Sequence, residues 1–284
     1  MHQPYYREGL KGAYHLPWVY LHGIKDYSDM AAHLERYPLM RAVMNFAPVL
    51  LEQLDDYAQQ LDVLLKHGKP TQDHMLNLLS GVERIPSDVA SRLRIVQDCQ
   101  RCHAPRMIHP YPPFYRLVRM ISPGNTDTGG AADLPVHLGY LSEQYFLDLL
   151  TWYHLAWLGN SLRQLPLVQR LMAQETGFSA ADRHELLHLM QSCMAGLIPR
   201  YRALAERGQV ELSMTPYGHP IVPLLNDFGN LRDALPDVPV PDAPAYPGGS
   251  ARARWHLQHG VEVFERYFGI KPAGVWLSEG GVSE

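Results

Sequence analysis

A short apolar run at residues 41–46 lies between two longer stretches, residues 25–38 and 50–65, in which apolar residues recur at helical spacing. The short run stops before Pro48 and predicts a strand, whereas the flanking stretches predict amphipathic helices. Helix, strand and helix in close order favour an α/β fold, because two parallel strands need a long crossover that is usually a helix.

The same alternation returns between residues 210 and 277. Residues 210–214 and 273–277 predict strands, and a helix that begins at Ser250 and extends to Phe268 separates them. Only residues 278–284 follow the last predicted strand. A strand inside a parallel sheet needs a covering helix and neighbouring strands, so we expect the sequence to be part of a longer protein.

Residues 68–135 interrupt this alternation with a high density of Pro, Gly and polar residues. Pro removes the backbone donor that a central strand needs, so we expect an insertion of helices and irregular segments rather than strands. Two helices are predicted beyond it, and Ser142 is the expected N-cap of the first. The second follows Ser179, where Ser179 and Asp182 resemble a capping box with Asp in place of Glu.

The composition is that of an ordinary globular protein, with 46% hydrophobic residues, 19% charged residues and a net charge of -4 over 284 residues. No basic block or stripe suggests a nucleic-acid partner. No uncharged apolar run reaches the roughly 18 residues of a membrane helix, and no secretory signal opens the sequence. Three cysteines are too few for a disulfide framework, so we expect a cytoplasmic protein without nucleic-acid or membrane partners.

Glu279 is a carboxylate just after the predicted strand at residues 273–277, with Trp276 before it and Gly280-Gly281 after it. The glycines permit a tight turn, and the indole offers a stacking surface for a sugar ring. A retaining glycosidase uses one carboxylate as nucleophile and a second as acid and base, so this setting suits a glycosidase carboxylate. From these residues alone, an exposed glutamate in a turn is the more frequent explanation.

Three motifs, in order, resemble the first three sequence signatures of glycoside hydrolase family 57. They are His2-Gln3-Pro4, Gly208-Gln209-Val210-Glu211 and Trp276-Leu277-Ser278-Glu279. Their flanks are similar to the amylopullulanase and α-amylase branch of the family, at residues 5–6, 17–22, 25–27, 215–217 and 219–225. Each motif is weak alone, but the resemblance extends over nearly the whole sequence outside residues 68–135.

The resemblance implies a partial catalytic barrel over residues 1–284, an incomplete (β/α)7-type barrel of the glycoside hydrolase and deacetylase kind with residues 68–135 inserted in it. It also implies an enzyme that acts on α-glucans or maltooligosaccharides with retention of configuration and without a cofactor or metal. Glu279 matches the nucleophile of the family. The positions that match substrate-binding or cleft residues are His2, Gln3, Trp18, Glu211, His219 and Trp276.

Some of these matches have alternatives. Trp18 and His219 are equally compatible with core packing, and Glu211 with a structural hydrogen bond at a strand end. The general acid/base of the family is an Asp in a later signature that lies beyond residue 284. Because a retaining enzyme needs two carboxylates about 5–5.5 Å apart, we expect the 284-residue polypeptide alone to lack appreciable activity.

Three functions are therefore open from the sequence. The first is a retaining α-glucan hydrolase or transglycosidase of the α-amylase, amylopullulanase or 4-α-glucanotransferase type. The second is an inactive fragment that at most binds sugar. The third is a metal-dependent hydrolase similar to polysaccharide deacetylases, which needs converging His and Asp ligands that these motifs do not supply. The sequence leaves open the oligomeric state and the choice between α-1,4 and α-1,6 linkages.

Cys99, Cys102 and His103 have the spacing of metal ligands. A four-ligand zinc site needs a further ligand from elsewhere in the chain. We therefore interpret the two cysteines as an incidental reduced pair in a helix.

Overall fold

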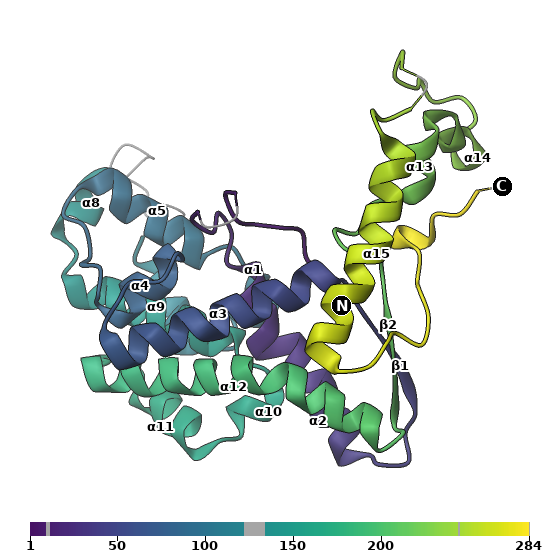
Figure 1. Cartoon of the computed structure of the whole chain (residues 1–284). Helices are drawn as coiled ribbons and strands as arrows, with labels where there is room; N and C mark the ends of the chain where they lie inside the picture. The colour runs from purple at the N-terminus through teal and green to yellow at the C-terminus, as the bar shows by residue number, and fades with distance from the viewer. Residues whose placement is uncertain (10–11, 122–133, 244, 284) are drawn as a thin grey trace. The chain divides into compact units, whose positions relative to one another are not determined.

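The computed structural model describes residues 1–9, 12–121, 134–243 and 245–283, which form two compact units (Figure 1). The sheet unit contains residues 1–6, 30–56 and 195–284, and the helical unit contains residues 7–29 and 57–194. Three helices have residues in both units: α2 (Ser28–Arg36), α3 (Pro48–His67) and α12 (Ala180–Glu206).

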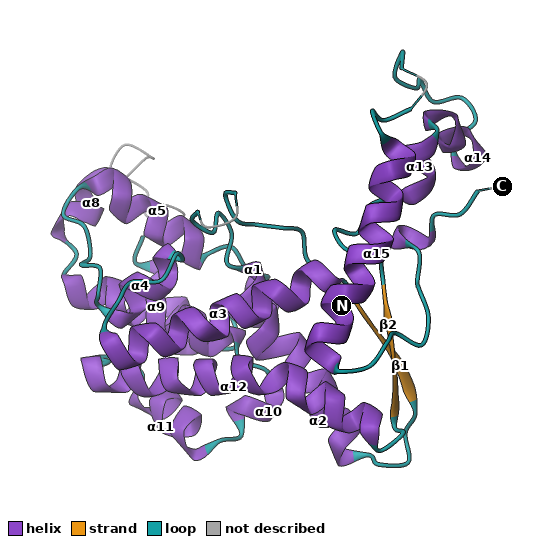
Figure 2. Cartoon of the chain, in the orientation of Figure 1, coloured by secondary structure: helices purple, strands orange, loops and turns teal. Residues whose placement is uncertain are grey.

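The sheet unit is built on two parallel strands, β1 (Ala42–Phe46) and β2 (Val210–Met214), drawn in orange in Figure 2. Ala42 pairs with Val210 at one end of this pair, and Phe46 pairs with Met214 at the other. The strands predicted at residues 41–46 and 210–214 are thus confirmed.

Two further segments extend this sheet through backbone hydrogen bonds. The Ala47 amide donates to the Met1 carbonyl at 2.9 Å, which places Met1 beside the carboxyl end of β1. On the far side of β2, the Trp276 amide donates to the Met214 carbonyl at 2.8 Å, and Val275 forms a parallel bridge with Met214. These segments bring the residues that follow them to the carboxyl-terminal edge of the sheet.

One face of the sheet carries the core of this unit. The ring of Phe46 lies 5.1 Å from Tyr201 of α12 and 5.2 Å from Phe268 of α15 (Gly249–Phe268), and all three side chains are buried. On the other face Val43 is 63% exposed and its register partner Glu211 is exposed as well. This second face is open only toward the amino-terminal ends of the strands, because Ser213, two residues beyond Glu211 on the same face, is only 8% exposed. Shorter helices of this unit are α13 (Val222–Asn226), the 3-10 turn Phe228–Asn230 and α14 (Leu231–Ala234).

The helical unit has no strand in its described residues, only a single bridge between Arg7 and Tyr14. Its core contains Tyr20, Phe146, Trp152 and Tyr153, all buried. Its helices are α1 (Trp18–His22), the π-helix Gly23–Tyr27, α4 (His74–Ser80), α5 (Val89–Cys99), α6 (Ala104–Met107), α7 (Pro112–Arg119), α8 (Leu134–Tyr140), α9 (Glu143–Trp157), α10 (Asn160–Arg163) and α11 (Pro166–Gln174). Residues 68–135 lie within this unit and are helical or irregular where described; residues 122–133 lie outside the described residues.

Both predicted serine caps are confirmed. The Ser142 hydroxyl accepts from the Tyr145 amide at 3.3 Å at the start of α9. Ahead of α12, the Ser179 amide donates to the Asp182 carboxylate at 2.9 Å and the Asp182 amide donates back to the Ser179 hydroxyl at 3.2 Å. This reciprocal pair is a capping box in which Asp replaces Glu.

Two predicted boundaries are wrong. The helix predicted over residues 25–38 is replaced by α1, which begins at Trp18, a π-helical turn and α2. α2 ends at Arg36, because the ring of Pro38 disfavours a helical conformation of the residue before it. The helix expected to begin at Ser250 begins at Gly249, after Gly248 in the left-handed region. A Cβ on Gly249 would lie 1.6 Å from the Leu225 carbonyl oxygen, so the close approach of α13 fixes this start.

The strand predicted at residues 273–277 is reduced to the bridge at Val275. Among the described residues no further strand pairs with its other edge. The fold is therefore α/β, with helices dominant and a small parallel sheet. The (β/α)7 barrel expected from the resemblance is not seen in the described part of the chain. No described helix is both long and apolar enough to cross a membrane.

Candidate active site at the carboxyl edge of the sheet

Three sequence-predicted residues meet at the carboxyl-terminal edge of the parallel sheet. The imidazole rings of His2 and His219 stack with their centroids 3.7 Å apart and their planes 16° apart. The carboxylate Oε1 of Glu279 lies 3.9 Å from Nδ1 of His219. Active sites of parallel α/β folds occupy this edge, because the loops that follow the strands converge there.

The backbone of the site adopts conformations that few residues tolerate. His219 has φ of 58° and Glu279 has φ of 56°, both in the left-handed region. Gly280, one of the two glycines expected to permit a tight turn, has φ of 67°. Non-glycine residues in this region cost about 1–3 kcal/mol each and are frequent at functional sites. Two strained residues facing one another therefore favour a functional role for this loop pair.

Both histidines are neutral near pH 7. Burial lowers the pKa of His2 below its usual 6.5, and the Glu279 carboxylate opposes this shift only in part. Burial also lowers the pKa of His219, the charge of His2 lowers it further, and Glu279 again raises it. The side chain of His219 is only 12% exposed, whereas that of Glu279 is 65% exposed. Neutral imidazoles can donate and accept hydrogen bonds beside an accessible carboxylate.

Gln53 of α3 fixes the segment that carries His2. Its side-chain amide donates to the Pro4 carbonyl at 3.1 Å, and its side-chain carbonyl accepts from the Tyr6 amide at 3.1 Å. Gln53 is only 2% exposed. The sequence motifs did not identify this residue. A usable signal was present, since Gln53 lies one turn before Tyr57 on the apolar face of its helix, where a polar side chain requires partners.

Glu52, the neighbour of Gln53, holds the loop that carries His219. The Tyr217 hydroxyl donates to Glu52 Oε2 at 2.6 Å, and the Val49 amide donates to the Tyr217 carbonyl at 3.2 Å. Arg266 of α15 donates to the other oxygen of Glu52 at 3.3 Å. Burial, with the nearby carboxylate of Glu52, raises the pKa of Tyr217, so its hydroxyl stays a donor. Two adjacent residues of α3 thus hold the two histidine loops.

The remaining predicted residues lie in different places. Gln3 accepts a hydrogen bond from the Tyr6 hydroxyl at 3.2 Å and lies beside the site. Trp276 is at the carboxyl edge too, and its side chain is 63% exposed. Trp18 belongs to the helical unit, where its ring lies 5.8 Å from that of Trp157.

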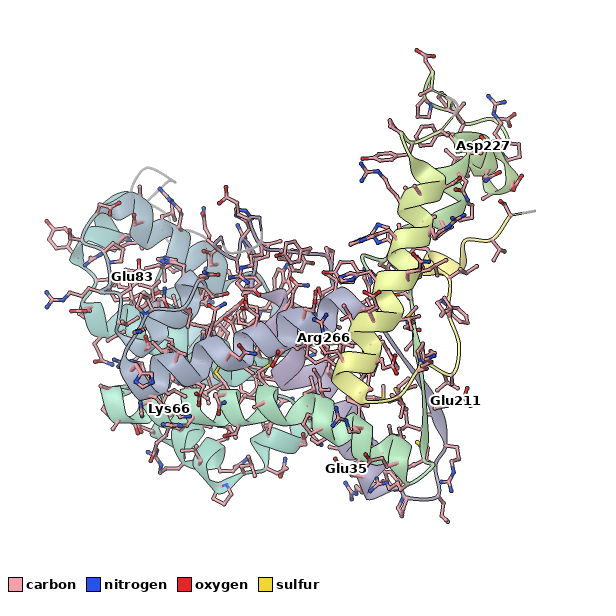
Figure 3. All side chains as sticks on the ribbon, in the orientation of Figure 1. Glu35, Lys66, Glu83, Glu211, Asp227 and Arg266 are labelled. Carbon is pink, nitrogen blue, oxygen red and sulfur yellow. The ribbon has the colours of Figure 1, made fainter. Side chains whose placement is uncertain are left out.

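Glu211 is not brought to the histidines. It is the second residue of β2 and is labelled in Figure 3. It lines an open pocket at the amino-terminal ends of the two strands, beside residues 41–43. Met214, at the carboxyl end of β2, is three positions further along, a rise of about 10 Å along a strand. The structure therefore groups His2, His219 and Glu279, and leaves Glu211 further along the sheet.

The two histidines and Glu279 could in principle hold a metal ion, since their donor atoms lie within 4.8 Å of one another. A zinc ion requires imidazole nitrogens about 2.0–2.1 Å away with lone pairs that converge on it. The two stacked rings have planes only 16° apart, so their in-plane lone pairs lie in nearly parallel planes and do not converge on one point. This arrangement does not fit a metal ion and gives no support to a deacetylase-like site.

The second candidate metal group is also unsuited to that role. Cys99 is buried, and burial raises the pKa of its thiol. Burial raises the pKa of Cys102 to about 11. Among the described residues, no group of three His, Cys, Asp or Glu donors that could hold a metal ion includes either cysteine.

No curated protein matches the chain. Similar solved structures are two family 57 branching enzymes, from Pyrococcus horikoshii (16% identity, TM-score 0.40) and Thermococcus kodakaraensis (17%, 0.39), and the α-amylase AmyC from Thermotoga maritima (12%, 0.42). Each alignment covers 98% of this chain but 33%, 31% and 34% of the other chain, so the chain spans about a third of their length. The model of glycosyl hydrolase family 57 matches residues 1–284, and the chain belongs to that family.

Proposed function

We propose that the protein is a retaining glycoside hydrolase or transglycosidase acting on α-glucans, with Glu279 as its nucleophile. The observation that carries this proposal is the convergence of Glu279, His2 and His219 at the carboxyl edge of a parallel sheet, in a chain of family 57. Segments that share this edge support a (β/α)7-type barrel, with residues 68–135 as an insertion. The cytoplasmic location and the lack of cofactors remain predictions from the sequence.

In this mechanism the accessible carboxylate of Glu279 attacks the anomeric carbon while an acid protonates the leaving oxygen. The glycosyl group is then bound covalently to Glu279. Water releases it in hydrolysis, whereas a hydroxyl group of a second glucan releases it in transfer. By resemblance to the family, the acid is an Asp that belongs to a later sequence signature.

The other residues bind the sugar beside Glu279. The neutral imidazoles of His2 and His219 donate and accept hydrogen bonds with sugar hydroxyls, and the exposed indole of Trp276 stacks on a sugar ring. Gln3, Trp18 and Glu211 are assigned to further substrate contacts by resemblance alone. The preferred linkage and the balance of hydrolysis and transfer depend on acceptor contacts.

The test is a Glu279→Gln variant of the full-length protein, assayed on maltooligosaccharides, amylose and pullulan. We expect turnover to fall at least about 10³-fold, because the nucleophile is lost while the shape of the side chain is kept. Glu265→Gln, at an exposed position of α15, is the matched control and should retain activity. Azide should restore turnover in Glu279→Ala and yield a glycosyl azide. Full activity of Glu279→Gln would remove the nucleophile assignment.

A further inference from the structure

Trp255 forms the centre of an aromatic cluster on α15. The His259 ring stacks on it at 4.8 Å with the planes 21° apart. The rings of Tyr217 and His256 meet it at 5.4 Å and 5.0 Å, at angles of 79° and 76°. Three neighbouring rings thus fix the indole, yet Trp255 remains 50% exposed.

The core of the sheet unit does not require this indole. The buried side of α15 is formed by residues such as Ala253, Val263 and Phe264. A lone exposed apolar side chain needs no explanation in a folded protein. A large ring that is held in place by three others and still contacts water is different, because its orientation is set before any ligand arrives.

The cluster is joined directly to the candidate active site. The Tyr217 amide donates to the His256 carbonyl at 2.9 Å, and the Gly218 amide donates to His256 Nδ1 at 3.2 Å. His219, which stacks on His2, is the next residue of the same loop. The turn that carries the active-site histidine therefore rests against the helix turn that carries Trp255.

The surroundings of Trp255 fit an uncharged polyhydroxyl ligand. Aromatic rings stack on apolar surfaces, and imidazoles bind hydroxyl groups. Burial, followed by the charge of Arg252, lowers the pKa of His256, so this imidazole is neutral at pH 7. Arg252 brings a positive charge near His256, and the Glu262 carboxylate lies 3.3 Å from His259, so the charges near the indole have both signs. An anionic ligand such as a nucleotide would need a cationic cluster instead.

We propose that Trp255, supported by His259 and Tyr217, is an outer subsite that stacks on a glucosyl unit of an α-glucan whose reacting end lies at Glu279. This inference rests on the proposed function. It predicts that Trp255 contributes to the binding of long chains and not to that of short ones. Its contribution is ground-state binding, so its loss raises KM for long chains and leaves kcat unchanged.

The experiment measures the affinity of full-length Glu279→Gln protein for maltose and maltoheptaose by calorimetry, with and without a second substitution. Trp255→Ala should weaken maltoheptaose binding about three- to tenfold, the range expected for a lost aromatic contact, and change maltose binding less than twofold. Trp255→Phe should keep most of the affinity, and His259→Ala should give a smaller loss than Trp255→Ala. Tyr37→Ala is the matched control, because Tyr37 is 51% exposed in the same unit.

The outcomes separate this inference from the proposed function. Unchanged maltoheptaose affinity in Trp255→Ala would overturn the outer subsite and leave the proposed function standing. Equal losses for maltose and maltoheptaose would also overturn it, since an outer subsite affects only the longer chain. Failure of the parent protein to bind either sugar would overturn both proposals. If Trp255→Ala does not fold, the comparison between Trp255→Phe and His259→Ala decides in the same way.

Discussion

The imidazoles of His2 and His219 lie face to face at 3.7 Å, although the two residues are far apart in the sequence. Their stacking follows from two neighbouring side chains of α3. Gln53 binds the backbone of Pro4 and Tyr6, and Glu52 binds the hydroxyl of Tyr217. The spacing of the histidines is therefore set by one helix, and it should respond to changes in that helix that leave the histidines untouched.

Gln53→Leu should lower the free energy of unfolding by about 1–3 kcal/mol, because it leaves the Pro4 carbonyl and the Tyr6 amide without their partner. It should also loosen the histidine stack. Chemical denaturation gives the first quantity, and histidine ring resonances give the second. Gln258→Leu, at an exposed position of α15, is the matched control and should change stability by less than about 0.5 kcal/mol. Equal effects of the two substitutions would contradict the role of Gln53.

Two glycines of the sheet unit should respond in opposite ways to alanine. At Gly249 an added Cβ would meet the Leu225 carbonyl oxygen at 1.6 Å, so Gly249→Ala must displace α13 from α15 and cost about 1–3 kcal/mol. At Gly196, inside α12, nothing lies within 4 Å of an added Cβ. Gly196→Ala should therefore stabilise the protein by about 0.5–1 kcal/mol through helix propensity. Urea unfolding of both variants measures the difference, and the same sign for both would contradict the packing of α13 on α15.

The helical unit contains two buried groups, His154 and Asp73, whose contributions to stability change with pH in opposite directions. Burial lowers the pKa of His154 from 6.5 to about 4, where Nδ1 faces the Leu150 carbonyl and Nε2 lies 2.9 Å from the Tyr20 hydroxyl. Burial raises the pKa of Asp73 from 3.8 to about 6. Between pH 4 and 6 the unfolded chain binds a proton at His154 that the fold excludes, so this group adds stability as pH rises. Asp73 does the reverse, because the fold keeps a proton that the unfolded chain loses.

Substitution of His154 should change how the stability of the protein depends on pH. Relative to the variant His154→Gln, the wild-type protein should gain roughly 3 kcal/mol of stability between pH 4 and pH 6.5, at about 1.4 kcal/mol per pH unit. The variant lacks the contribution of His154, so the effect of Asp73 should determine how its stability changes between pH 4 and 6. The free energy of unfolding of the variant should therefore fall as the pH rises over this range. Urea unfolding at several pH values measures both slopes. A stability difference that is independent of pH would show that His154 is not buried in its neutral form.

Periodicity predicted the elements that local sequence determines. The strands at residues 42–46 and 210–214 and the caps at Ser142 and Ser179 follow from apolar spacing and from side chains that bond to nearby amides. The start of α15 could not be predicted in this way. Gly249 is placed by its contact with a carbonyl group of α13, which no local sequence pattern reveals. Boundaries set by tertiary contacts are outside the reach of such patterns.

The site was predicted in the same uneven way. Glu279, His2 and His219 were identified through motifs, and the structure brings them together. Gln53 and Glu52 were missed, because they carry no motif and act through the backbone and the hydroxyl group of other residues. Glu211 was expected among the substrate-binding residues, but a motif gives no distance along a strand. Its position toward the amino-terminal end of β2 could only come from the pairing register.

The electrostatic coupling within the site gives a prediction that is independent of catalysis. The carboxylate of Glu279 favours the protonated imidazole, so it raises the pKa of both His2 and His219 against the larger effect of burial. In Glu279→Gln this opposing effect is lost, and both pKa values should fall further below 6.5. A folded-state pKa below the unfolded value also means that these groups reduce stability as pH falls below about 6.5.

Histidine titrations followed by NMR on the 284-residue chain test this directly. Both ring signals should titrate below pH 6.5 in the wild-type chain and at lower pH in Glu279→Gln. The larger change is expected at His219, whose Nδ1 lies 3.9 Å from the Glu279 carboxylate. Glu265→Gln should leave both titrations unchanged, because this side chain lies on the exposed side of α15. Titrations that do not respond to Glu279→Gln would place its carboxylate away from the histidines. The loop that carries Glu279 would then not be assembled as the structure has it, and its assignment as nucleophile would lose its geometric support.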